Sequence, residues 1–380
     1  MNPLDPNFQR LMQEATRLTH GGDLQAATAA IQSALGGGAA GPNNAWGTDG
    51  LSMFERVLDG VIDVEAREIG EPSAPADPSQ ARSQATPGKG PRFISGSHID
   101  PAAGTREYKL FIPSAAALGD APLPLVVMLH GCTQNPDDFA TGTQMNAVAE
   151  SRGFYVLYPA QSQRANPQRC WNWFKHSHQQ RGRGEAALLA GMTRAVMEGG
   201  GHRIDARRVY VAGLSAGGAM AAILGREYPE LFAAVGVHSG LAAGAATDLP
   251  SAMAAMSGGA SATHAASGAA SGTPTIVFHG DADSTVHPRN AEQVIAASAG
   301  MGGAVEVDRG TRAGGAGRSH TRRVHRAADG RVVAESWTVH GAPHAWSGGN
   351  ARGSYTDSRG PDASAEMVRF FMEHPRSAPN

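Results

Sequence analysis

The sequence has little of what several protein classes require. Its 380 residues carry 32 Lys and Arg against 34 Asp and Glu, so the formal net charge is −2. A chain this close to neutral lacks the basic excess of a nucleic-acid-binding protein, so no nucleic acid is expected as a partner. It contains no run of 18 apolar residues, and we therefore expect no transmembrane segment.

Targeting signals and cysteines are equally scarce. Residues 1–6 lack both the basic and the apolar region of a secretory signal, so the default expectation is a cytoplasmic protein. The two cysteines, Cys132 and Cys170, are too few for a structural zinc site built on cysteine alone. No metal is expected, and the pair is sufficient for one disulfide.

What remains is the composition of an ordinary globular chain, with 41% hydrophobic and 17% charged residues. Apolar residues recur at helical spacing between residues 5 and 36, so residues 1–66 are predicted to form a short helical N-terminal region. Residues 67–92 are rich in Pro, Ser and Ala and are interpreted as a linker. The remaining segment, 93–376, is predicted to be a catalytic α/β domain.

In that domain, predicted strands alternate with predicted helices. This alternation indicates an α/β fold with a mostly parallel central sheet and helices on both faces. Two low-complexity stretches, 242–272 and 300–317, are expected to lie on the surface without a packed core. The predicted strands are 108–113, 125–129, 154–158, 208–212, 233–237 and 275–278, the predicted helices 185–197, 216–228 and 363–373, and a late hairpin joins 322–325 to 331–339.

A candidate nucleophile stands between a strand and a helix. Residues 213–217 read Gly-Leu-Ser-Ala-Gly, a G-x-S-x-G motif that follows the predicted strand 208–212 and precedes the predicted helix 216–228. Flanking glycines remove the Cβ clashes of a tight turn, and the helix N-terminus favours developing negative charge. We therefore predict that Ser215 is a nucleophile; the alternative is a glycine-rich turn with a solvated serine.

A serine nucleophile needs a base and an orienting acid, which follow it in this order on such folds: Ser, acid, His. Two carboxylates, Asp281 and Asp283, come directly after the predicted strand 275–278. Asp283 is the preferred acid, because Asp281 suits ordinary turn chemistry. His344 lies in a loop bounded by Gly and Pro past a late strand and is the preferred base, with His340 as its rival.

The developing oxyanion needs backbone donors. One is expected from Ala216, the residue after the nucleophile, and the other from Cys132 in the loop that follows the predicted strand 125–129. The alternative for that loop is a plain His-Gly turn. Trp171 and Trp173, in an aromatic-rich segment, are candidates to line the substrate pocket, and the alternative is a core or loop-anchoring cluster.

Four motifs together resemble those of the polyhydroxybutyrate (PHB) depolymerase family of esterases. The resemblance extends over roughly residues 93–374 and implies an α/β-hydrolase fold and a serine esterase without a cofactor. Its triad corresponds to Ser215, Asp283 and His344 and its oxyanion residue to Cys132, while Trp346 joins the tryptophans as a candidate substrate-binding residue. The motifs are Leu-His-Gly-Cys-Thr-Gln at 129–134, Cys-Trp-Asn-Trp-Phe at 170–174, Gly-Leu-Ser-Ala-Gly-Gly at 213–218 and His-Ala-Trp-Ser-Gly-Gly at 344–349.

The resemblance implies an enzyme that hydrolyses polyhydroxyalkanoate polymer, oligomers or related short esters. Many members are extracellular and carry a polymer-binding module, whereas this chain ends soon after its closing helix. Amorphous polymer, oligomers and small esters are therefore the expected substrates. A feruloyl or acetylxylan esterase is the alternative enzyme, and a non-catalytic binding protein on a hydrolase fold is the alternative of another class. The oligomeric state does not follow from the sequence.

The family motifs surround both cysteines, and on that basis a Cys132–Cys170 disulfide is predicted. It would close a loop of about 40 residues, contributing about 4 kcal/mol by the loop-entropy model. Its expected role is to hold the oxyanion loop against the wall of the pocket near Trp171. The alternative is a pair of buried free thiols, which a reducing cytoplasm would favour.

Overall fold

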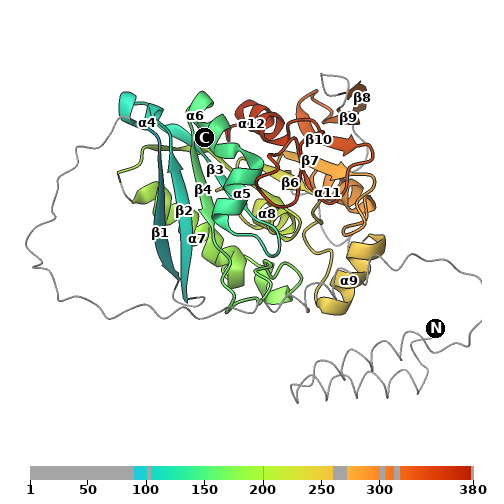
Figure 1. Ribbon diagram of the computed structural model, residues 1–380, viewed down its shortest axis with the longest axis horizontal. Coiled ribbons are helices and arrows are strands. Elements are labelled where there is room, and N and C mark those ends of the chain that lie inside the picture. The colour runs from blue at the N-terminus through green and yellow to red at the C-terminus, as the bar shows by residue number, and fades with distance from the viewer. Residues whose placement is uncertain are drawn as a thin grey trace, which may run out of the picture. The chain divides into compact units, whose positions relative to one another are not determined.

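A computed structural model describes residues 90–100, 104–199, 201–259, 272–299, 304–311 and 317–377 (Figure 1). The predicted helical region 1–66 and nearly all of the predicted linker 67–92 lie outside the described residues. None of the helices within the described ranges has the length and hydropathy that crossing a bilayer requires.

One large sheet organises the described part of the chain (Figure 1). Its ten strands lie in the order β1-β2-β4-β3-β5-β6-β7-β10-β9-β8, and β11 and β12 form a separate pair. The strands are β1 (Arg92–Asp100), β2 (Gly104–Ile112), β3 (Leu123–Leu129), β4 (Tyr155–Pro159), β5 (Ile204–Leu214), β6 (Ala234–His238), β7 (Thr275–Gly280), β8 (Ala304–Thr311), β9 (Ser319–Arg326), β10 (Val332–Val339), β11 (Trp346–Ser347) and β12 (Thr356–Asp357).

The centre of this sheet is parallel and its two edges are antiparallel. Each neighbouring pair in the series β4-β3-β5-β6-β7-β10 runs parallel. The hairpin β1–β2 continues the sheet antiparallel on one side, and the hairpin β9–β10 with β8 does so on the other. A mostly parallel sheet and the late hairpin are thus confirmed, whereas the hairpin β1–β2 was missed because its strand β1 is polar and largely exposed.

Helices cover both faces of the sheet (Figure 1). Along β3, alternate side chains enter two separate cores: Leu125 and Val127 pack with α7 and α8, and Val126 and Met128 pack with α5, α6 and α12. This alternation is what a strand buried on both faces produces. The helices are α4 (Ala115–Leu118), α5 (Pro136–Thr143), α6 (Met145–Arg152), η1 (His176–His178), α7 (Gly184–Glu198), α8 (Ala216–Glu227), α9 (Leu249–Gly258), α11 (Arg289–Ala299) and α12 (Ala363–Glu373).

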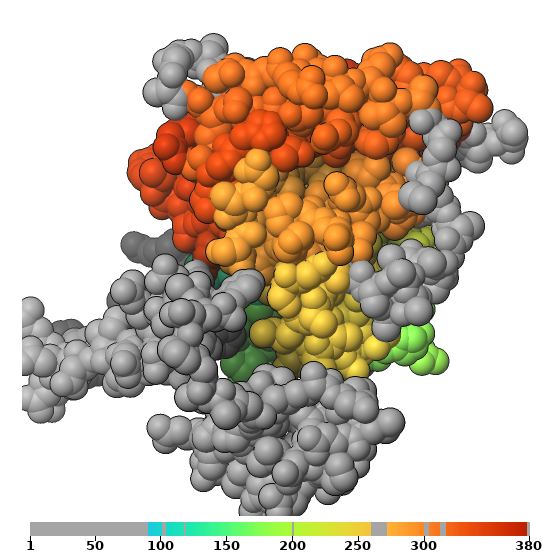
Figure 2. Space-filling model, turned by 90° about the vertical axis from the view of Figure 1, so that its right-hand side faces the viewer, coloured from blue at the N-terminus to red at the C-terminus, as the bar shows by residue number. Residues whose placement is uncertain are grey.

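The low-complexity stretch 242–272 differs from its prediction in the part that the structure describes. Ala242, Ala246 and Ala255 are buried in the core beside α7 and α8. Small side chains let the backbone approach its neighbours closely, so an alanine-rich segment packs although it buries little area per residue. Figure 2 shows α9, in yellow, next to the orange surface of the segment that follows β7, where His287 N–H donates to the Met256 carbonyl. The expectation of a purely superficial segment is therefore wrong for 242–259.

The second low-complexity stretch, 300–317, is described at 304–311 and at residue 317. Residues 304–311 form β8, an edge strand whose side chains are almost all exposed. The surface location therefore agrees with the prediction, while the strand itself was not predicted. Alternating valines at 305 and 307 are the signal for it in the sequence.

Candidate active site

Ser215 occupies a strained turn between β5 and α8. Its backbone has φ 57° and ψ −120°, a region that a non-glycine residue adopts only when its surroundings impose it. The Ser215 N–H donates to the His238 carbonyl at the end of β6, at 2.9 Å. The Ser215 side chain does not cap α8, which leaves its hydroxyl available for other partners.

Two glycines allow this turn to lie directly on the end of β3. A Cβ at Gly217 would collide with the carbonyl groups of Leu129 and His130, and one at Gly213 would collide with the backbone of Gly217. A Cβ at Gly131 would lie 3.7 Å from the Ser215 Cβ, so the loop after β3 borders the serine. Close backbone packing therefore brings together the two segments that the sequence selected as nucleophile turn and oxyanion loop.

Asp283 follows β7 and is paired with His344. Its Oδ2 lies 2.7 Å from His344 Nδ1, and its Oδ1 accepts the N–H groups of Thr285 and Val286 at 2.9 Å each. Burial alone would raise the pKa of the Asp283 carboxyl. Hydrogen bonds from His279 and His344 outweigh that effect and hold the pKa well below its usual range. Asp283 is thus a buried, ionised carboxylate.

The rival residues form a second pair at the surface. Asp281 Oδ2 lies 2.8 Å from His340 Nδ1, and Asp281 Oδ1 accepts the Gly341 N–H at 2.6 Å. The side chains of His340 and Asp281 are 40% and 41% exposed, against 11% for His344 and none for Asp283. The structure therefore separates the two acids that the sequence left in competition, by burial and by partner.

The sheet order explains how these residues approach one another. Ser215, Asp283 and His344 come after the strands β5, β7 and β10, which are neighbours in the order β5-β6-β7-β10. These strands run parallel, so the segments that follow them leave the sheet at the same end. Among the described residues, the structure joins His344 to Asp283 but shows no hydrogen bond between His344 and Ser215. The hydrogen bond between a nucleophile and its base is often long before a substrate binds, so the two side chains can belong to one site without that bond.

The loop after β3 presents a backbone donor beside the serine. Within the described ranges, no acceptor takes the N–H of Cys132 or the N–H of Ala216. Both groups are therefore available to an anionic oxygen. The loop itself is internally braced, because Gly131 N–H donates to Gln134 Oε1 at 2.9 Å.

The same loop is tied to the segment after β4. Cys132 and Cys170 form a disulfide, which confirms the predicted bridge and rules out the alternative of free thiols. The Trp171 indole N–H donates to the His130 carbonyl at 3.1 Å, and the Gln161 N–H donates to His130 Nε2 at 3.1 Å. Burial lowers the pKa of His130 to about 4, so its Nε2 remains an acceptor at neutral pH.

A buried carboxylate that the sequence did not single out anchors this second segment. Glu185, at the start of α7, is 1% exposed. It accepts the Asn172 backbone N–H at 2.6 Å, the Asn172 amide at 2.7 Å and the Gln161 amide at 2.5 Å. Burial alone would raise the pKa of Glu185, but hydrogen bonds from His178, Gln161 and Asn172 lower it. A single Glu at a helix start carries no signal of such a role.

The three tryptophans predicted to bind substrate lie in the hydrophobic cores. Trp171 and Trp346 are 0% and 1% exposed, and Trp173 is 5% exposed. Trp346 stacks on His238 with ring centroids 5.0 Å apart and donates to Ser364 Oγ. A fully buried ring offers no face to a substrate, so Trp171 fits the core alternative. The burial of Trp346 likewise disagrees with its predicted substrate-binding role.

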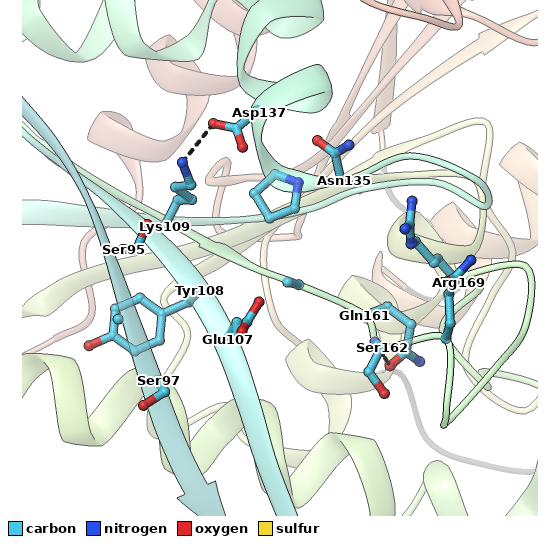
Figure 3. A pocket seen from close by; sticks show the side chains of 14 residues that line it. Ser95, Ser97, Glu107, Tyr108, Lys109, Asn135, Asp137, Gln161, Ser162 and Arg169 are labelled. Atoms are coloured by element: carbon cyan, nitrogen blue, oxygen red, sulfur yellow. Dashed lines mark hydrogen bonds and ion pairs between the residues drawn. The ribbon is translucent and has the colours of Figure 1, made fainter. Parts of the chain in front are cut away.

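A polar groove of about 590 Å³ opens beside the oxyanion loop (Figure 3). It lies between the hairpin β1–β2, the start of α5 and the loop after β4. An ion pair between Lys109 and Asp137, at 3.0 Å, spans part of it. The polar side chains that line it are Ser95, Ser97, Glu107, Tyr108, Lys109, Asn135, Asp137, Gln161, Ser162, Gln163 and Arg169.

Metal ligands do not gather in the described part of the chain. Among these residues, no group of three or more His, Cys, Asp or Glu side chains is arranged to hold an ion. The arrangement at Ser215 combines a strained serine, a buried carboxylate bonded to a partly buried imidazole, and two unpaired backbone donors. Such a set can carry out nucleophilic acyl transfer.

Comparison with known proteins gives one family match and several relatives. The family model described as "Esterase PHB depolymerase" matches residues 106–322. The poly(3-hydroxyalkanoate) depolymerase C of Paucimonas lemoignei is 34% identical over 236 residues, covering 59% of this chain and 55% of the relative. The feruloyl esterase B of Thermothelomyces thermophilus is 30% identical over 192 residues, covering 46% and 64%.

A solved structure shares the fold. The acetyl xylan esterase from Aspergillus awamori superimposes with a TM-score of 0.55 at 17% sequence identity, covering 74% of this chain and 99% of that one. Together with the sheet order, this likeness confirms the predicted α/β-hydrolase fold. The chain spans between half and two thirds of the length of the two curated relatives, at 55% and 64%.

The bridge between Cys132 and Cys170 predicts a redox-dependent stability. The two cysteines are 38 residues apart, so reduction is expected to lower the free energy of unfolding by about 4 kcal/mol in the loop-entropy model. Protein purified under oxidising conditions should take up no alkylating reagent when denatured, and should take it up at both cysteines after reduction. Two alkylated cysteines in unreduced, denatured protein would contradict the bridge.

Proposed function

The chain belongs to the PHB depolymerase family of esterases, and from this membership we propose that it is a serine carboxylic ester hydrolase acting through an acyl-enzyme. The observation that carries the proposal is the hydrogen-bonded pair of buried Asp283 and partly buried His344, at the same end of the parallel strands as the strained turn of Ser215. The chemistry is assigned to the predicted catalytic domain, 93–376.

The proposed reaction begins with attack by Ser215 Oγ on the ester carbonyl carbon. His344 Nε2 accepts the hydroxyl proton, while the Asp283 carboxylate holds the opposite nitrogen, Nδ1, and stabilises the imidazolium that forms. The carbonyl oxygen becomes an oxyanion, which the N–H groups of Cys132 and Ala216 stabilise. Each such donor contributes about 3–4 kcal/mol to the transition state.

The tetrahedral intermediate then collapses. The carbon–oxygen bond to the alcohol breaks, and the alkoxide leaves with the proton held by His344, so that an acyl-serine remains. His344 next takes a proton from water, whose oxygen attacks the acyl carbon. Return of that proton to Ser215 Oγ releases the carboxylic acid and restores the enzyme.

Esters of 3-hydroxyalkanoates, as oligomers or amorphous polymer, and related short esters are the proposed substrates. Two exposed apolar side chains support contact with such chains: Leu249 and Met253 stand one turn apart on α9 and are 59% and 52% exposed. The C-terminal end of α9 packs against the loop that carries Asp283, through the bond from His287 N–H to the Met256 carbonyl. An apolar polyester could therefore pass close to the reacting groups.

The polar groove favours a second candidate, an esterase for substituted carbohydrates. Its lining of hydroxyl, amide and charged groups suits a neutral, hydroxyl-rich chain (Figure 3). Asn135 and Arg169 belong to this lining, and in the sequence they stand three residues after Cys132 and directly before Cys170, so the groove borders the segments that the disulfide joins. Two of the relatives are named as esterases of the feruloyl and acetylxylan types.

Replacement of the nucleophile tests the enzyme against the non-catalytic alternative. Ser215→Ala is expected to lower kcat on p-nitrophenyl butyrate by about 10⁴-fold or more, because no other group supplies the attacking oxygen. Ser151→Ala, on the exposed side of α6, serves as the matched control and should retain wild-type activity. Near-wild-type kcat in folded Ser215→Ala protein, verified by circular dichroism, would refute the assignment.

A matched pair of substitutions tests the acid. Asp283→Asn is expected to lower kcat by about 10⁴-fold, as loss of a triad acid does elsewhere. Asp281→Asn should have a much smaller effect, because Asp281 is paired with the exposed His340 instead. Steady-state kinetics on the same ester measure both, and the opposite ranking would move the acid to Asp281.

Product analysis separates the two substrate classes. We expect a higher kcat/KM on soluble 3-hydroxybutyrate oligomers than on feruloylated sugars, measured by chromatography of the released acids. The reverse order would favour the carbohydrate esterase. In that case Arg169→Ala should raise KM for the sugar ester and leave p-nitrophenyl butyrate unaffected, since Arg169 lines the polar groove.

A further inference from the structure

A second histidine contacts the proposed catalytic acid from within the sheet. His279 lies near the end of β7 with a side chain only 3% exposed. Its Nε2 is 2.8 Å from the Val286 carbonyl oxygen and 3.3 Å from Asp283 Oδ2. A carbonyl oxygen can only accept a hydrogen bond, so Nε2 carries the proton and donates it to Val286, while Asp283 Oδ2 is a second, longer contact of the same N–H group.

The contacts of the turn converge on Asp283. Its Oδ2 lies 2.7 Å from His344 Nδ1 and 3.3 Å from His279 Nε2, while Oδ1 accepts the N–H groups of Thr285 and Val286. Val286 is therefore held twice, through its N–H by Asp283 and through its carbonyl by His279. His279, on strand β7, therefore ties the turn that carries Asp283 to the end of that strand.

We propose that His279 is a positioning residue that fixes the Asp283 carboxylate with Oδ2 directed at His344. The terminal torsion of an aspartate is broad, so the side chain alone does not set the direction of its oxygens. The Thr285 and Val286 N–H groups hold Oδ1 but belong to the same turn as Asp283. His279, on the buried strand β7, adds a constraint on Oδ2 from outside that turn. The inference rests on the proposed function, in which Asp283 orients the base.

The groups that face His279 are few. They include Asp283 in the turn, 3.3 Å away, and His238 on the neighbouring strand β6, which interacts electrostatically with His279 and with His344. Burial holds the pKa of His238 well below its usual value, which favours the neutral form of its ring. The Nδ1 atom of His279 is buried without a partner among the described residues, so Nε2 alone links this ring to the site.

Three substitutions at one position test the proposal. His279→Leu removes the donor, His279→Gln keeps an amide N–H near the place of Nε2, and His279→Asn carries an amide that is too short to reach it. His340→Gln is the matched control, because His340 contacts Asp281 at the surface as His279 contacts Asp283 in the core. The readouts are kcat, KM and the pH profile of kcat/KM on p-nitrophenyl butyrate.

We expect His279→Leu and His279→Asn to lower kcat by about 10- to 100-fold with little change in KM, as small misplacements of catalytic groups do. His279→Gln should stay within about 3-fold of wild type, because it restores the donor. Without the donor, the negative charge on Oδ2 holds the His344 imidazolium more tightly. The acidic limb of the profile should therefore move up by about half a pH unit in His279→Leu.

Two results would overturn the proposal. One is a folded His279→Leu protein with wild-type kcat and pH profile. A folded His279→Leu protein with lowered kcat but an unmoved acidic limb counts in the same way, because it would indicate a merely structural residue. The other, decisive if His279→Leu fails to fold, is equal activity of the Gln and Asn variants. A wild-type protein without ester hydrolysis, or an active Ser215→Ala variant, would instead refute the proposed function.

Discussion

A helix start and a strand end can touch only where no side chain stands between them, and Gly217 meets the carbonyls of Leu129 and His130 in this way. The contact fixes α8 against β3 and sets the backbone angles of Ser215. It also determines where the oxyanion loop begins, since that loop leaves the same end of β3. The close packing of the buried parallel sheet thus keeps Ser215 in its strained backbone conformation, because the neighbouring backbone leaves no space for Ser215 to adopt another one.

Buried carboxylates hold the segments around this contact. Asp283 and Glu185 each accept several hydrogen bonds, and Glu335 on β10 pairs with Arg322 and Arg369 at 2.7 Å. A buried charge is costly unless its partners are all in place. Each of these acids therefore favours one arrangement of its surroundings. Asp283 holds the turn beside His344, Glu185 holds the segment beside the disulfide, and Glu335 holds α12 on the sheet.

The disulfide and the Glu185 contacts act on one segment from two sides. Cys170 is bonded to the oxyanion loop, and Asn172, two residues later, is bonded to Glu185 at the start of α7. The loop after β3 has no regular structure of its own, so its position depends on this support. A rigid scaffold for a reactive loop is what preorganised stabilisation of an oxyanion requires.

The sequence by itself determined the α/β pattern, the serine turn, the central strands and α12, which begins and ends at the predicted residues. These features rest on local spacing and on residues whose backbone requirements are visible in a short window. Only the tertiary structure paired His344 with Asp283 rather than Asp281, buried Trp171 and Trp346, packed the alanines near α9, and placed Glu185 beside Asn172 and His279 beside Asp283. His279 and Asp283 are only four residues apart, but their burial depends on which strands become neighbours. The other outcomes are contacts between residues far apart in sequence, which leave no periodic or local pattern along the chain.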